Sequence, residues 1–261
     1  MSAAHSAVVL ASSGPSPLWY ATRAAGTVSL VLLTLTVVVG VLSAGRYAPR
    51  NIGRFEVSAL HRNLSLMTLV FLALHIVTAI ADSFTHIGWT AAVVPLTSSY
   101  RPLWVGLGAV AVDLLLAVAV TSAFRQRIGQ RTWKAVHWAA YASWPVALFH
   151  AAGTGTDTRL TPQLVLYAAC MAAVLGAVWW RLVRAGRHSR RIRWWAVPAT
   201  GIVPVLLAVF LATGPLQPGW SHRAAATFPS APAATSTATT PGAAAAPPPS
   251  ASPAPQGGSA A

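Results

Sequence analysis

Residues 61–75 read HRNLSLMTLVFLALH, an apolar segment with a histidine at each end. An imidazole is costly to place in a hydrocarbon environment unless a partner satisfies it. The segment overlaps one of six apolar runs, each close to the roughly 17–25 residues that a helix needs to cross a bilayer. The runs cover residues 18–42, 64–80, 103–123, 135–152, 163–183 and 194–212. The sequence therefore predicts an all-α membrane protein, built as a bundle of six transmembrane helices.

The composition supports this class. Of the 261 residues, 55% are hydrophobic and only 8% are charged, about a third of the charged share in a soluble domain. Outside the runs, residues 1–17 form a short N-terminal segment, and residues 214–261 are rich in Ala, Pro, Ser and Thr. Such a segment cannot bury enough apolar surface to fold. We therefore predict a transmembrane domain over residues 18–213, followed by a disordered tail.

The net charge of +14 follows the loops between the runs. Fourteen of the eighteen Lys and Arg residues lie in three segments, 46–62, 125–134 and 181–193, which alternate with loops of low charge. The positive-inside rule places these segments in the cytoplasm and both termini outside the plasma membrane. The charge thus indicates topology in a lipid bilayer, and it gives no indication of nucleic-acid binding.

A second run carries another pair of histidines, His137 and His150, in HWAAYASWPVALFH. The predicted topology makes this helix parallel to the one with His61 and His75. At 1.5 Å per residue the two spacings are about 21 and 19–20 Å, so each histidine has a counterpart at its own depth. Thirteen residues would turn His137 and His150 about 140° apart on an ideal helix, and we expect Pro145 to adjust this phase.

Two imidazoles at one depth favour a particular cofactor. Zinc usually takes about four protein ligands, or three and a water, and no Cys, Asp or Glu stands at either depth. Haem iron needs only two axial ligands, and a porphyrin suits a gap between transmembrane helices. The one cysteine, Cys170, excludes covalent attachment through C-x-x-C-H. We therefore predict two non-covalent haem groups, with His61, His75, His137 and His150 as axial ligands of the iron.

This pattern resembles the ferric-reductase-like transmembrane domain, which ferric reductases, NADPH oxidases and the haem subunit serving periplasmic methionine sulfoxide reductase share. In that family two helices each carry two histidines, thirteen or fourteen residues apart, that hold two b-type haems. The segments WYATRAAGTVSLVLLTLTVVVGVL, PLTSSYRPLWVGLGAVAVDLLLAVAVTSAFR and RTWKAVHWAAYASWPVALFHAAGTGTD are similar to the actinobacterial branch. The resemblance covers about residues 18–185.

The resemblance implies an oxidoreductase component that moves electrons across the membrane. The oxidases of the family attach a flavin- and NADPH-binding domain after the last core helix, whereas this chain continues with a basic loop and a sixth run. We therefore expect no flavin or nicotinamide site and a stand-alone membrane protein. The donor would be a separate cytoplasmic flavoprotein reductase or quinol, and the acceptor would be ferric iron or an extracytoplasmic redox protein.

Two arginines are further candidates. Arg62 adjoins His61 and could pair with a haem propionate, although an ordinary cytoplasmic arginine is an equal interpretation. Arg23 lies about a turn inside the first run on the outer side, against the charge rule, and could face the propionates of the outer haem.

Three other polar residues lie in or near the predicted helices. For Asp113, in the middle of the third run, we expect a packing role, with a proton path or haem tuning as alternatives. Asp82 and His86 could bind an acceptor metal, and a solvated loop is the simpler interpretation.

A haem-free transporter or scaffold, with the histidines as a proton or metal relay, is the alternative function. A transporter often shows inverted repeats, and the sequence contains no evident repeat.

Overall fold

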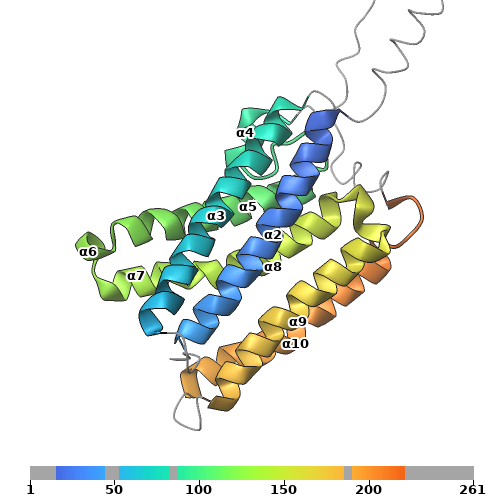
Figure 1. Cartoon of the computed structure of the whole chain (residues 1–261). Coiled ribbons are helices and arrows are strands. Elements are labelled where there is room, and N and C mark those ends of the chain that lie inside the picture. The colour runs from blue at the N-terminus through green and yellow to red at the C-terminus, as the bar shows by residue number, and fades with distance from the viewer. Residues whose placement is uncertain (1–15, 45–52, 83–86, 185–189, 221–261) are drawn as a thin grey trace, which may run out of the picture. The chain divides into compact units, whose positions relative to one another are not determined.

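The computed structural model describes residues 16–44, 53–82, 87–184 and 190–220 (Figure 1). These residues form helices and turns without a strand, which confirms the predicted all-α class. The elements are α2 (Pro17–Ala44), α3 (Arg54–Ala81), α4 (Trp89–Val93), α5 (Pro102–Ala123), α6 (Arg125–Ile128), α7 (Gln130–His137), α8 (Ala139–Thr154), the 3₁₀ helix η1 (Thr156–Arg159), α9 (Thr161–Arg184) and α10 (Arg190–Thr213).

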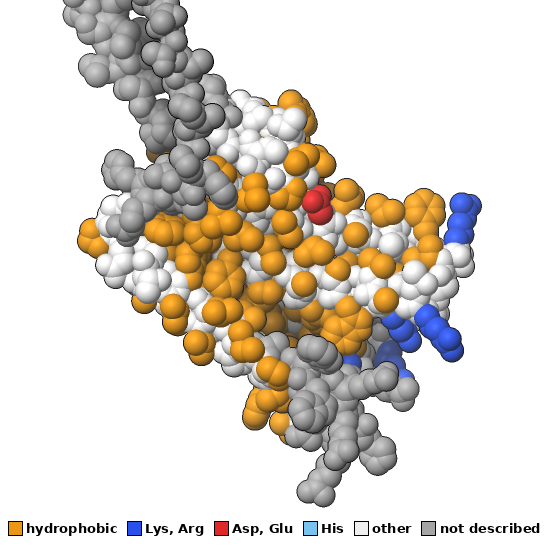
Figure 2. Space-filling model, turned by 180° about the vertical axis from the view of Figure 1, so that it is seen from behind, with side chains coloured by type: hydrophobic (Ala, Val, Ile, Leu, Met, Phe, Trp, Pro, Cys, Tyr) orange, Lys and Arg blue, Asp and Glu red, His pale blue; other side chains and the backbone are white. Residues whose placement is uncertain are grey.

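Four of the described helices, α2, α3, α5 and α9, are long and apolar enough to cross a membrane. Large hydrophobic side chains point outward from them, such as Val70 at 62% and Val183 at 67% exposure. Figure 2 shows such side chains spread over one face of the molecule. Outward-facing apolar surface of this extent suits lipid, and the chain is a membrane protein. The predicted count of six spans remains a prediction, because α8 has 16 residues and the apolar part of α10 covers Thr200–Thr213.

Helix α2 packs along α3, and it also contacts α8 and α9. A second close pair is α5 with α8, while α10 lies along α9 (Figure 1). The two closely packed pairs, α2 with α3 and α5 with α8, carry most residues of the candidate site, and α7 carries His137. Their mutual contact through α2 and α8 brings α3 and α8, which hold three of the four predicted histidines, into one assembly.

The buried core lies where α2, α8, α9 and α10 meet, and Leu148 of α8 at its centre is fully buried. One polar contact crosses it, because the indole Nε1 of Trp144 donates to Oγ1 of Thr34 at 2.9 Å. This bond satisfies both groups in surroundings where an unpaired one would be costly. Cys170 is buried in the same cluster, as expected for a small packing residue.

The fourth predicted helix, residues 135–152, is interrupted in the structure. Helix α7 ends at His137, Trp138 forms a turn, and α8 then continues through Pro145. At the turn the amide of Tyr141 bonds the carbonyl of Trp138 at 3.0 Å, three residues back, and such bonds wind the chain more tightly than an α-helix. We expected Pro145 to change the helical phase, whereas the interruption lies directly after His137.

The predicted tail begins too early at residue 214. Residues 214–220 form turns that Arg159 of η1 anchors by donating to three backbone carbonyls, those of Pro215, Leu216 and Gln217. The ring of Trp220 packs on Trp104 of α5, with centroids 5.4 Å apart. These contacts join segments that lie far apart in the sequence. The amino-acid composition alone, from which the boundary was predicted, carries no information about them. The remainder of the predicted tail lies outside the described residues, as does the N-terminal segment up to residue 15.

Candidate functional site

The four predicted histidines meet in two pairs. His61 and His75 lie on α3, His137 on α7 and His150 on α8. The ring centroids of His75 and His150 are 6.2 Å apart with their planes at 80°. Those of His61 and His137 are 6.4 Å apart with their planes at 75°. The interruption at Trp138 thus accompanies an arrangement in which both histidines of the α7–α8 segment face a histidine of α3.

Three of the rings have a defined hydrogen-bonding state. The Nδ1–H of His75 donates to the carbonyl oxygen of Thr22 at 2.8 Å. His150 donates in the same way to Trp104 at 2.7 Å, and His61 to Thr36 at 3.2 Å. A carbonyl can only accept, so Nδ1 carries the proton and the lone pair lies on Nε2. An imidazole held in this tautomer by a backbone carbonyl is prepared to bind a metal through Nε2.

His137 differs from the other three. Its ring stacks on Trp133 with centroids 5.0 Å apart and an angle of 27° between the planes. Its Nδ1 is buried and has no hydrogen-bond partner among the described residues. The polypeptide therefore orients this ring by stacking rather than by a bond to a carbonyl.

A cavity of about 590 Å³ contains the His75/His150 pair. Its walls come from α2, α3, α5, α8 and α9, and most of its lining is apolar, as at Leu33 and Val112. Polar groups also line it, among them Thr22, whose buried Oγ1 has no partner in the described part of the chain. An apolar cavity of this size with a few polar groups is typical of a site for a large organic ligand.

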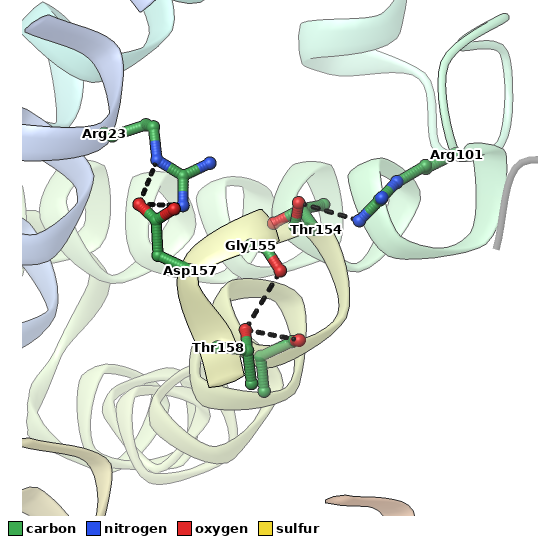
Figure 3. Close-up of polar contacts among 7 residues, drawn as sticks. Arg23, Arg101, Thr154, Gly155, Asp157 and Thr158 are labelled. Carbon is green, nitrogen blue, oxygen red and sulfur yellow. Dashed lines mark hydrogen bonds and ion pairs between the residues drawn. The ribbon is translucent and has the colours of Figure 1, made fainter. Parts of the chain in front are cut away.

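Arg23 lines this cavity and pairs with Asp157 of η1 (Figure 3). Its Nε donates to Oδ2 of Asp157 at 2.7 Å, and a terminal nitrogen contacts the same oxygen. The guanidinium also lies over the ring of Trp19, 4.5 Å from the centroid. Arg23 thus lines the same cavity as His75 and His150, and Asp157 is its partner. The other predicted arginine, Arg62, is exposed on α3.

The end of α8 beyond His150 is held by two polar side chains. Arg101, only 3% exposed, donates to the carbonyls of Gly153 and Thr154. Thr158 donates to the carbonyls of Gly155 and Ala152. Figure 3 shows the Arg101–Thr154 bond and the bonds of Thr158 beside the Arg23 pair. The last carbonyls of a helix lack internal partners, and a cation there is favourable, so these bonds fix the helix that carries His150.

Of the remaining predicted residues, Asp82 also lines the His75/His150 cavity. Asp82 is buried, and its Oδ1 accepts from Ser16 Oγ at 2.6 Å, which corrects the expectation of a solvated loop for this residue. His86 lies outside the described residues. Asp113 is exposed on α5, so the expected packing role within this chain is wrong. The described residues contain no group of three or more His, Cys, Asp or Glu side chains that could hold a metal ion.

Fold and site together define the class of the protein: an all-helical membrane protein that holds imidazole pairs between its helices. Residues 17–157 match the family described as a domain of unknown function, DUF8596. The chain is 30% identical over 188 residues to the protein-methionine-sulfoxide reductase heme-binding subunit MsrQ of Ralstonia nicotianae, covering 71% of this chain and 81% of that protein. The chain therefore belongs to the DUF8596 family and to that of MsrQ, which confirms the predicted superfamily of ferric-reductase-like haem proteins. No solved structure matches it.

Proposed function

We propose that this protein carries electrons across the plasma membrane through two b-type haems, one held by the His75/His150 pair and one by the His61/His137 pair. The observation that carries this proposal is the matched geometry of the pairs, with ring centroids 6.2 and 6.4 Å apart. The similarity to a heme-binding subunit supports it.

The spacing of the rings suits one metal ion between each pair. An imidazole nitrogen binds a first-row metal at about 2.0–2.1 Å, and the ring centre lies roughly 1 Å behind that nitrogen, so two axial imidazoles have centroids about 6 Å apart. Both measured distances agree with this value. A bare metal ion would need further ligands, whereas a porphyrin supplies four of its own.

The chain's own residues would hold, orient and shield the cofactor. The His75/His150 cavity offers apolar walls for a porphyrin. A guanidinium has five N–H donors, so Arg23 can bond Asp157 and still pair with a propionate. Arg62 is the corresponding candidate beside His61. When bound, each haem would supply a one-electron Fe(III)/Fe(II) couple. If two histidines held each haem iron, no open position would remain on the iron, and a substrate would have to be reduced without binding to it.

The proposed direction is from the cytoplasm outward. It rests on the basic segments, which the positive-inside rule assigns to the cytoplasm together with the His61/His137 pair. The donor would be a separate flavoprotein reductase or quinol, and the acceptor ferric iron or an extracytoplasmic redox protein. A stand-alone protein of the actinobacterial type with six spans and both termini outside fits this scheme. A transporter or scaffold without haem is the alternative.

The first test is the absorption spectrum of the protein purified from haem-replete cells. We expect low-spin b-type bands after reduction with dithionite and two haems per chain, because each imidazole pair saturates one iron. The near-perpendicular ring planes should also give a strongly anisotropic low-spin EPR signal in the oxidised protein. A folded protein without haem would refute the proposal and favour the transporter or scaffold.

Substitution of Arg23 tests its proposed place beside the outer haem. We expect Arg23→Gln to lower the midpoint potential of the His75/His150 haem, because loss of a nearby positive charge stabilises the oxidised iron and leaves Asp157 uncompensated. The shift should be about 40 mV, corresponding to about 1 kcal/mol for one electron. A redox titration measures both haems, and Arg184→Gln at the far end of α9 is the control. An unchanged midpoint potential in Arg23→Gln would refute the proposed place of Arg23 beside the haem.

A further inference from the structure

The ring of His75 reaches the backbone of α2 through a gap left by a glycine. Its Nδ1–H donates to the carbonyl of Thr22, and Gly26 follows one helical turn later. A Cβ atom on Gly26 would lie 2.9 Å from Cε1 and Nδ1 of the ring, closer than van der Waals contact allows. In a helix the carbonyl of Thr22 already accepts the amide of Gly26, so a second donor needs space beside that residue. We call such a carbonyl, with the glycine four residues later, a carbonyl–glycine unit.

The same unit occurs three times in the described chain. The other two are Thr36 and Gly40 on α2 with His61, and Trp104 and Gly108 on α5 with His150. A Cβ would lie 3.1 Å from the ring of His61 at Gly40 and 2.6 Å from the ring of His150 at Gly108. Gly26 and Gly40 are fourteen residues apart, as are His61 and His75. The equal spacing on the two antiparallel helices keeps each unit at the level of its histidine.

The fourth histidine lacks such a unit. Fourteen residues after Gly108, α5 carries Ser122. Its Oγ accepts from the indole Nε1 of Trp133 at 3.2 Å, and Trp133 in turn stacks on His137. The buried Nδ1 of His137 remains without a hydrogen-bond partner among the described residues. Ser122 therefore contacts Trp133, the residue on which His137 stacks.

We propose that Gly26, Gly40 and Gly108 are positioning residues that give the axial histidines access to backbone carbonyls, and that Ser122 denies this access to His137. This inference rests on the proposed function. A bond from Nδ1–H to a carbonyl fixes the ring and raises the basicity of the ligand, which stabilises oxidised iron. The two haems are therefore supported unequally: the His75/His150 haem has two such ligands, and the His61/His137 haem has one.

Alanine at the glycines tests the first half of this proposal. Gly108→Ala is expected to lose the His75/His150 haem, halving the haem content, or to raise its midpoint potential, because the methyl group displaces the ring from its carbonyl. At Gly40 the added Cβ would lie farthest from its histidine ring, at 3.1 Å. Gly40→Ala should therefore raise the midpoint potential of the His61/His137 haem without loss of that haem. Gly176→Ala is the matched control, because a Cβ there has no neighbour within 4 Å. Haem content and separate potentials, with circular dichroism for folding, are the measurements.

Ser122 tests the second half without introducing a clash. Ser122→Gly opens the backbone of α5 to His137 and should lower the potential of the His61/His137 haem. Ser122→Ala removes the hydroxyl and its bond to Trp133 but keeps the Cβ, and should leave the potential higher than in Ser122→Gly. Equal potentials in these two variants would overturn the role of Ser122.

The outcomes separate this inference from the function on which it rests. Wild-type protein without haem would refute the proposed function. Wild-type protein with two haems, together with a Gly108→Ala variant whose haem content and potentials equal those of Gly176→Ala, would refute the role of the glycines alone. If Gly108→Ala does not fold, the milder Gly40→Ala and the Ser122 variants decide the question in its place.

Discussion

His150→Ala is expected to remove one of two haems and leave the other in place. Under the proposed function, the substitution deletes one of the two axial ligands of a haem, and the remaining imidazole alone cannot saturate the iron. The second pair lies about 20 Å away along the helices, so its ligands and packing are unchanged. We expect half the wild-type haem content in a pyridine haemochrome assay, and one step instead of two in a redox titration.

Alanine variants of the other three histidines test which histidines form a pair. His75→Ala should give the same single step as His150→Ala, whereas His61→Ala and His137→Ala should both leave the other step. Phe149→Leu is a suitable control, because Phe149 neighbours His150 and packs on Phe210 with centroids 5.6 Å apart but offers no ligand. If His75→Ala and His150→Ala retain different haems, the assigned pairing is wrong.

The depth of the histidines could be predicted from the sequence, and their phase could not. Fixed rise per residue makes His61 and His75 on one helix, and His137 and His150 on another, fall at matching levels. The phase depends on where the second helix departs from ideal geometry. Pro145 was the visible candidate, because proline removes a backbone donor, yet the turn lies at Trp138, a residue type with no strong signal for such a break.

The backbone carbonyls and glycines that contact the histidines were not predicted, for a different reason. A backbone carbonyl belongs to every residue, so nothing in the residue types of Thr22 or Trp104 identifies them as acceptors. The glycines did carry a signal, because Gly26 and Gly40 repeat the fourteen-residue spacing of the histidines. Close approach of an imidazole to a helix requires a missing Cβ, so equal spacing on a neighbouring helix would have located the partner surface.

Polar contacts between residues far apart in the sequence could not be predicted either. The sequence identified Arg23 as a candidate because a charge inside an apolar run is conspicuous. Its partner Asp157 is 134 residues away in a short 3₁₀ helix, and nothing local links the two. The same holds for the turn anchored by Arg159, which extends the folded region past the predicted boundary at residue 214.

Vesicles reconstituted with His61→Ala or His150→Ala are expected to transfer no electrons across the membrane, although each variant keeps one haem. The two histidine pairs, each proposed to hold one haem, lie near opposite ends of the helices, about 20 Å apart, in a hydrocarbon core about 30 Å thick. Electron tunnelling decays steeply with distance, so neither haem alone can connect the two aqueous phases. Wild-type vesicles loaded with ferricyanide should bleach when dithionite is added outside, and the variants should bleach no faster than vesicles without protein.

The remaining haem makes the loss of transfer interpretable. In each variant it should still be reduced by dithionite after detergent is added, which shows that the protein is folded and loaded. Gly176→Ala vesicles provide the matched control and should bleach at the wild-type rate, because that position has open space around it. Transfer at the wild-type rate through a protein with one haem would show that electrons cross by another path, and the two imidazole pairs would then not form a transmembrane chain.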